Sequence, residues 1–113
     1  MAIDRLKTSI WIQAQTRICG LAYIPIFVVK KGDPDAGVVL LKVSSMDGLC
    51  RLYSQIRDPS GALAWSQSAS GGNRLNDADA DAYIEKQKKY DPDIWVVEVE
   101  DPNGLYQLDG KEM

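Results

Sequence analysis

The stretch Ile24–Val43, IPIFVVKKGDPDAGVVLLKV, decides how the rest of the 113-residue chain is interpreted. It contains two runs of β-branched and aliphatic residues, Ile26–Val29 and Val38–Val43, separated by the polar segment 30–37. Runs of this composition favour strands, and the Gly, Pro and Asp residues between them are typical of a turn. The stretch therefore predicts a β-hairpin at the centre of a sheet.

Both predicted strands are apolar on both sides. Alternate residues of a strand point to opposite faces of the sheet, and here both sets are hydrophobic. Val39, Leu41 and Val43 share one face, whereas Val38 and Leu40 lie on the other. Strands of this kind need a cover on each face. We expect that cover either from two helices that divide between the faces or from a partner subunit on the second face.

The first helix is predicted over residues 4–20. Apolar residues recur there at helical spacing and form one stripe: Ile3, Leu6, Ile10, Ala14, Ile18 and Leu21. A stripe of this kind normally faces the core of a globular protein, and Trp11 at its margin is expected to pack there. Pro25 prevents the helix from continuing into the strand that follows.

The second helix is predicted to begin at Asn76 or Asp77, because both residue types cap helix N-termini well. Aspartates crowd its first turns and lysines its last turns, an order that complements the helix dipole. Its apolar positions are few, so we expect it to pack on one side only. Pro92 prevents it from continuing.

Three further strands are predicted, over residues 49–57, 62–67 and 94–100. The element order is then α-β-β-β-β-α-β, and short connections favour antiparallel neighbours. The expected fold is α+β, with an antiparallel sheet of about five strands (two hairpins and a C-terminal strand) packed with two helices. We expect a single globular domain over residues 1–113, with residues 109–113 frayed.

Composition excludes several classes of function. The chain has no histidine, which removes the usual general base and most zinc ligand sets. A net charge of −3 argues against a nucleic-acid partner. No run approaches the length of a membrane span and no signal peptide is visible, so we expect a cytoplasmic protein with no membrane contact. Cys19 and Cys50 lie among apolar residues and are expected to be buried, reduced thiols; a disulfide between them is the alternative.

Asp33 and Asp35 are the candidate metal ligands. Two carboxylates on one turn can converge on Mg²⁺ or Mn²⁺, which favour oxygen ligands, and Lys30 or Lys31 could then neutralise a phosphate. This pattern would fit a metal-assisted enzyme acting on a phosphorylated small molecule. The competing interpretation is structural, because Asp before Pro is a favoured way to open a turn.

A second candidate site is the polar face of the predicted sheet. Its cationic and aromatic members are Lys42, Arg51, Tyr53 and Arg57, which we expect to share one face with Glu98 and Glu100. Tyr and Arg are enriched where protein interfaces concentrate their binding energy. The face is therefore either solvated or a binding surface for a peptide or another protein.

Two motifs carry a resemblance to a known family. They are the hexapeptide Gly-Asp-Pro-Asp-Ala-Gly at residues 32–37 and the run Asp-Pro-Asp-Ile-Trp-Val-Val-Glu at residues 91–98. With them, nearly the whole chain resembles a family of short alphaproteobacterial proteins known as domain of unknown function 1491. The resemblance implies a bacterial cytosolic single domain. It implies no activity, cofactor or catalytic residue.

These observations favour a non-catalytic binding module without a cofactor, acting through a sheet edge or the polar sheet face. Such a module predicts a homodimer or another protein partner. The alternative is the metal-assisted enzyme that uses Asp33 and Asp35.

Overall fold

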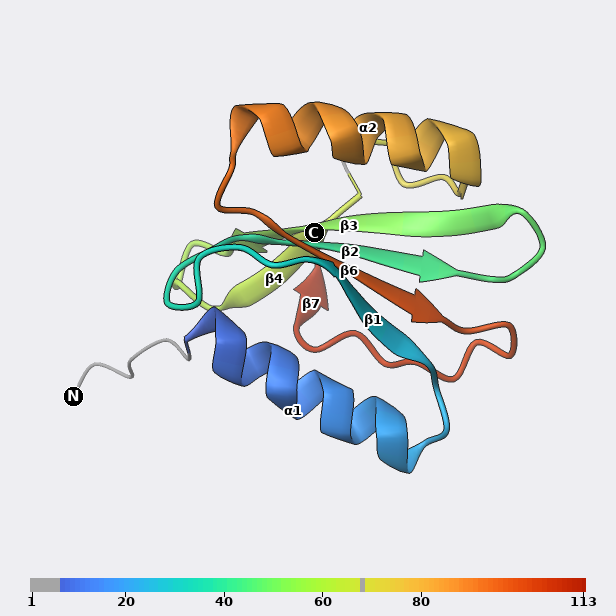
Figure 1. Ribbon diagram of the computed structural model, residues 1–113, viewed down its shortest axis with the longest axis horizontal. Coiled ribbons are helices and arrows are strands. Elements are labelled where there is room, and N and C mark those ends of the chain that lie inside the picture. The colour runs from blue at the N-terminus through green and yellow to red at the C-terminus, as the bar shows by residue number, and fades with distance from the viewer. Residues whose placement is uncertain (1–6, 68) are drawn as a thin grey trace.

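The computed structural model describes residues 7–67 and 69–113, which form a β-sheet with one helix on each face (Figure 1). In chain order the elements are α1 (Thr8–Leu21), β1 (Ile26–Lys30), β2 (Val39–Ser44), β3 (Leu49–Arg57), β4 (Leu63–Ser66), β5 (Leu75–Asn76), α2 (Asp77–Tyr90), β6 (Trp95–Glu100) and β7 (Lys111–Glu112). The α+β class and both helices are confirmed. The predicted start of the first helix at residue 4, and the stripe residues Ile3 and Leu6, lie outside the described residues.

The sheet is mixed and has seven strands instead of about five. Its order is β1-β6-β2-β3-β4-β7, with β5 also paired to β3. The predicted hairpin of β1 and β2 is wrong, because β6 lies between them, antiparallel to β1 and parallel to β2. β4 and β7 are parallel as well. The sheet is therefore not purely antiparallel.

Burial explains why β6 takes the inner position. Its residues Val96, Val97 and Val99 are buried although they point to both faces of the sheet. A strand that is apolar on both faces is most stable between two neighbours. β1, in contrast, is exposed at Phe27 and Val29 and lies at the edge.

The β3–β4 hairpin is confirmed, and its turn is held by Asp58. The Asp58 carboxylate accepts hydrogen bonds from the Ser60 backbone N–H and hydroxyl and from the Ala62 N–H. The Lys111 ammonium from β7 lies 3.0 Å from the same carboxylate. The bond from Ser60, followed by that from Lys111, holds the pKa of Asp58 well below its ordinary value.

Each face of the sheet has its own core, so the two helices divide between the faces as the first of our alternatives expected. Trp11, Ile12 and Cys19 of α1 pack with Leu41 and Val97 on one face. The other core lies under α2, and its buried members are Leu40, Leu52, Ile84, Ile94 and Val96. Both cysteines are free and buried, as predicted.

The C-terminal residues are ordered, so the prediction that residues 109–113 are frayed is wrong. The Asp109 carboxylate accepts a hydrogen bond from Trp11 Nε1 at 2.8 Å, and its carbonyl accepts one from Trp65 Nε1 at 2.7 Å. The N–H of Met113 donates to the Trp65 carbonyl at 2.8 Å. These bonds hold the C-terminal residues against Trp65 of β4 and Trp11 of α1.

The loop between β1 and β2 crosses the start of β6 at very short range. A Cβ added to Gly32 would lie 2.1 Å from the Asp93 carbonyl oxygen, and one added to Gly37 would lie 2.6 Å from it. The Asp33 N–H donates to that same carbonyl, and Trp95 Nε1 donates to the Asp33 carbonyl at 2.7 Å. Glycine is needed at both positions because no side chain fits between the two backbones.

We predict that Gly32→Ala destabilises the protein by about 1–3 kcal/mol or more, since the methyl group forces two fastened backbones apart. Urea unfolding followed by circular dichroism measures the change. Gly20→Ala is the matched control, because nothing lies within 4 Å of its Cβ position and it lies in α1. The free energy of unfolding of Gly20→Ala should be unchanged or higher by up to about 1 kcal/mol. Equal stabilities for the two variants would contradict the crossing.

Candidate functional site

The candidate metal ligands Asp33 and Asp35 each have a partner of their own. Asp33 Oδ2 accepts a hydrogen bond from the Ala36 N–H at 2.8 Å, which closes the turn. Asp35 Oδ1 lies 3.7 Å from the Lys7 ammonium, and both side chains are largely exposed. Within residues 7–67 and 69–113, no group of three or more His, Cys, Asp or Glu side chains is arranged to hold a metal ion. The turn interpretation accounts for these contacts.

Lys30, the candidate phosphate contact, is directed at backbone carbonyls. Its ammonium donates to the carbonyls of Pro92 at 2.8 Å, Ile94 at 3.0 Å and Lys31 at 3.1 Å. These bonds hold the start of the loop against the segment that leads from α2 into β6. The Lys30 ammonium therefore stabilises the crossing of the β1–β2 loop over the start of β6.

We predict that Mn²⁺ causes no line broadening confined to residues 32–37 in an NMR titration of the labelled protein. The reason is that turn closure already occupies one carboxylate and a cation lies beside the other. Mg²⁺ is the diamagnetic control. Broadening confined to those residues at low metal concentration, and lost in Asp33→Asn, would establish the metal site instead.

The polar residues expected on one face of the sheet lie on two. The register pairs Leu41 with Tyr53 and Lys42 with Leu52, so Lys42 points to the opposite face from Tyr53. Lys42 shares its face with Glu98, its neighbour in β6. The expectation of a single face is therefore wrong. The cause is register, because pairing displaced by one residue exchanges the faces of a strand.

The remaining three members stay together on the α1 side of β3. Arg51 Nη1 donates to Gln67 Oε1 and to the Gly72 carbonyl, both at 3.3 Å. Tyr53 is half-buried against the core, and burial raises the pKa of its hydroxyl. Arg57 is exposed at the end of β3. Their binding role stays a prediction.

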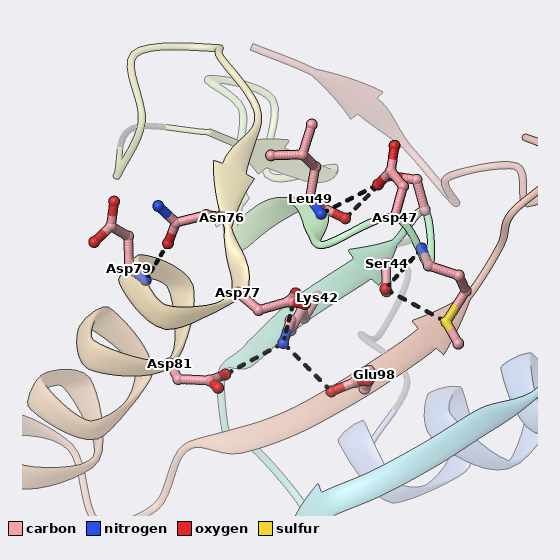
Figure 2. A network of polar contacts seen from close by, with 11 residues as sticks. Lys42, Ser44, Asp47, Leu49, Asn76, Asp77, Asp79, Asp81 and Glu98 are labelled. Atoms are coloured by element: carbon pink, nitrogen blue, oxygen red, sulfur yellow. Dashed lines mark hydrogen bonds and ion pairs between the residues drawn. The ribbon is translucent and has the colours of Figure 1, made fainter.

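Lys42 is the buried centre of an ion cluster under α2, and its carboxylate partners Asp77, Asp81 and Glu98 are partly exposed (Figure 2). Its side chain is only 7% exposed, and its ammonium lies 3.2 Å from Asp81, 3.3 Å from Asp77 and 3.8 Å from Glu98. Asp77 Oδ1 has no hydrogen-bond partner among the described residues, so the ion pair is what compensates its burial. Sequence reasoning found Lys42 and placed Glu98 on its face, but it missed that α2 supplies Asp77 and Asp81.

Opposing effects act on the Lys42 charge. Burial lowers the pKa of Lys42, but the carboxylates of Asp81, Glu98 and Asp77 outweigh it, and the net pKa is raised above the ordinary 10.5. A raised lysine pKa contributes stability that is complete below 10.5 and is lost only as pH rises through the raised value. The Lys42 ammonium is therefore fully charged at neutral pH.

We predict that Lys42→Met costs about 1–3 kcal/mol at pH 7, because it leaves three carboxylates facing one another without a cation. The deficit should be the same at pH 9, because the raised pKa keeps Lys42 charged there. Urea unfolding at both pH values measures it. Lys88→Met, at an exposed pair with Glu85, should cost less than about 0.5 kcal/mol. A Lys42→Met deficit no larger than that of Lys88→Met would contradict a stabilising role of the ion cluster.

A groove of about 790 Å³ opens where β3 continues beyond the first residue of β2. β2 begins at Val39, and the loop before it turns away toward β6 and α1 while β3 continues beside β4. Where the two strands separate, Gln55 Oε1 accepts a hydrogen bond from the Val39 N–H at 2.9 Å. Trp11, Asp35, Arg57, Leu63 and Asp109 are among the lining residues.

A large apolar surface lies on α1 and β1, and sequence reasoning missed it. The predicted stripe of α1 points outward: Ile10 is 47%, Ile18 57% and Leu21 75% exposed. The inward face is formed by Thr8, Trp11, Ile12, Gln15 and Cys19. We call the outward stripe (Ile10, Ala14, Ile18, Leu21), Tyr23 and the exposed β1 residues Val28 and Val29 the α1–β1 surface. Phe27, which pairs with Glu98, is also exposed but lies on the α2 face of the sheet.

The helix is turned this way because two polar residues of the inward face find buried partners. Thr8 Oγ1 donates to the Gly37 carbonyl at 2.7 Å, and Gln15 Oε1 accepts from the Tyr106 hydroxyl at 3.0 Å. Both partners are far away in sequence, so no local pattern could have revealed them. The apolar stripe of α1 is visible in the sequence, but the prediction that it faces the core is wrong.

Comparison with known proteins assigns a family to this fold. The sequence profile described as "Protein of unknown function (DUF1491)" matches residues 6–109. The chain belongs to the DUF1491 family. The resemblance seen in the sequence is thereby confirmed.

Solved structures of DUF1491 proteins share the fold. A crystal structure of a family member from Caulobacter crescentus has 37% identity and a TM-score of 0.83, covering 96% of this chain and 100% of that one. An NMR structure from the same organism has 38% identity and a TM-score of 0.78, covering 96% of both chains. Protein Atu0922 from A. tumefaciens, at 23% identity, 86% coverage of both chains and a TM-score of 0.69, shares the fold. A search of curated proteins found no match.

The two motifs that carried the DUF1491 resemblance meet in space. The hexapeptide 32–37 is the loop that crosses the start of β6, and the run 91–98 supplies the backbone it crosses. Both motifs therefore have a structural role at this crossing.

No helix within residues 7–67 and 69–113 is long and apolar enough to cross a membrane.

Proposed function

We propose that this DUF1491 protein is a non-catalytic interaction module that binds a protein partner through the α1–β1 surface. The supporting observation is the outward apolar stripe of α1, to which the edge strand β1 adds further exposed apolar residues. Groups of exposed apolar residues usually mark interaction sites, whereas single exposed hydrophobic residues are ordinary. The cytoplasm is the compartment we propose, because Cys19 and Cys50 are free thiols.

The edge strand adds a second means of binding. β1 pairs with β6 on one side, and its other side is the outer edge of the sheet among the described residues (Figure 1). Strand edges present backbone donors and acceptors that a partner segment can use. A homodimer in which two α1–β1 surfaces face each other is the alternative occupant.

The other candidate surfaces are supported less well. Arg51, Tyr53 and Arg57 remain on one face of β3, but Arg51 is hydrogen-bonded to Gln67 and Gly72 and Tyr53 packs into the core. The metal-assisted enzyme would need Asp33 and Asp35 to give up their present partners. We therefore keep the binding module as the proposed function.

We predict that a photo-crosslinking amino acid at Ile18 captures a protein of discrete size in the native host. The same residue at Lys86, on the exposed face of α2, is the matched control and should give no such product. An adduct twice the mass of the chain would identify the homodimer, and any other single mass a different protein. The absence of a discrete adduct from Ile18, in cells where the variant is folded and abundant, would refute the proposed function.

A further inference from the structure

The charges of the chain divide unevenly around the α1–β1 surface. Residues 7–32, which build that surface, contain Lys7, Arg17, Lys30 and Lys31 and no carboxylate. Residues 33–113 contain eight cations and fifteen carboxylates. In a protein with a net charge of −3, the segment that builds the α1–β1 surface therefore contributes only positive charge.

Arg17 lies within the outward stripe itself. It follows Ile10 by seven residues and Ala14 by three, so these side chains share one side of α1. Arg17 is exposed, and no ion pair is formed by it within the described part of the chain. Lys7, at the start of the helix, is paired with Asp35 at 3.7 Å.

The spacing of the stripe suits a helix as the partner element. Its members recur at intervals of four, four and three residues along about 16 Å of helix axis. Such rows form the ridges and grooves by which helices pack on one another. Ala14 at the middle of the row leaves room for close approach.

We propose that the partner of the α1–β1 surface is an acidic amphipathic helix of another protein, an inference that rests on the proposed function. Its apolar side packs on Ile10, Ala14, Ile18 and Leu21, and its carboxylates pair with Arg17 and Lys7. Opposite charges across an interface guide association and reject partners of the wrong sign. A second copy of this chain fits less well, because the same surface would bring the same cations together.

The test uses the Ile18 crosslinker in the native host, combined with charge reversal. Arg17→Glu should reduce the yield of the adduct by about fivefold or more, since it places like charges in contact. Lys86→Glu is the matched control and should leave the yield unchanged. Circular dichroism verifies that both variants are folded. Mass spectrometry of the crosslinked peptide then identifies the partner segment.

The outcomes separate this inference from the proposed function. A crosslinked segment with apolar residues at helical spacing and an excess of Asp and Glu, together with the loss in Arg17→Glu, supports both. An adduct that is insensitive to Arg17→Glu, a segment without that acidic excess, or a second copy of the chain overturns the acidic helix and leaves the binding module intact. Adducts with lipid overturn the acidic helix and make an anionic membrane the occupant. The absence of any discrete adduct removes both proposals.

Discussion

The crossing of the β1–β2 loop over the start of β6 is the contact on which the rest of the sheet depends. β1 and β2 follow each other in sequence but lie on either side of β6, so the chain between them must pass the end of that strand. It passes at a distance that only glycine permits at positions 32 and 37. Hydrogen bonds to Asp93 and Trp95 fasten it there. The crossing keeps the position between β1 and β2 open for β6.

The same loop fixes helix α1. The first N–H groups of a helix lack partners within the helix, and Lys7 at the N-cap provides no side-chain bond. The carbonyls of Pro34 and Asp35 accept the N–H groups of Ser9 and Thr8 in its place. One segment of the chain therefore sets the position of β6 in the sheet and the start of the helix below it. These contacts give the hexapeptide at residues 32–37 a structural role.

Local features of this fold could be predicted from the sequence, whereas pairing between distant segments could not. The Asn76 cap and the β3–β4 hairpin depend on neighbouring residues, and both were predicted. The β1–β2 hairpin failed because sequence neighbours usually pair, and nothing local indicates that a strand some fifty residues later separates them. The candidate site failed for a related reason. Lys42 changes faces with a shift of one residue in register, and its carboxylate partners come mostly from α2.

The orientation of α1 links the fold to the proposed function. The residues of α1 that pack in the core on that face are Trp11, Ile12 and Cys19, and the outward residues take no part in it. A helix with a single core-facing stripe would have polar residues at those positions. Here Ile18 and Leu21 face solvent while Thr8 and Gln15 are buried and hydrogen-bonded. Exposed apolar side chains at regular helical spacing gain nothing from the monomer, and they gain free energy only when a second molecule removes them from water. That asymmetry is the physical reason for placing the binding site on α1 instead of on the better-satisfied polar face of the sheet.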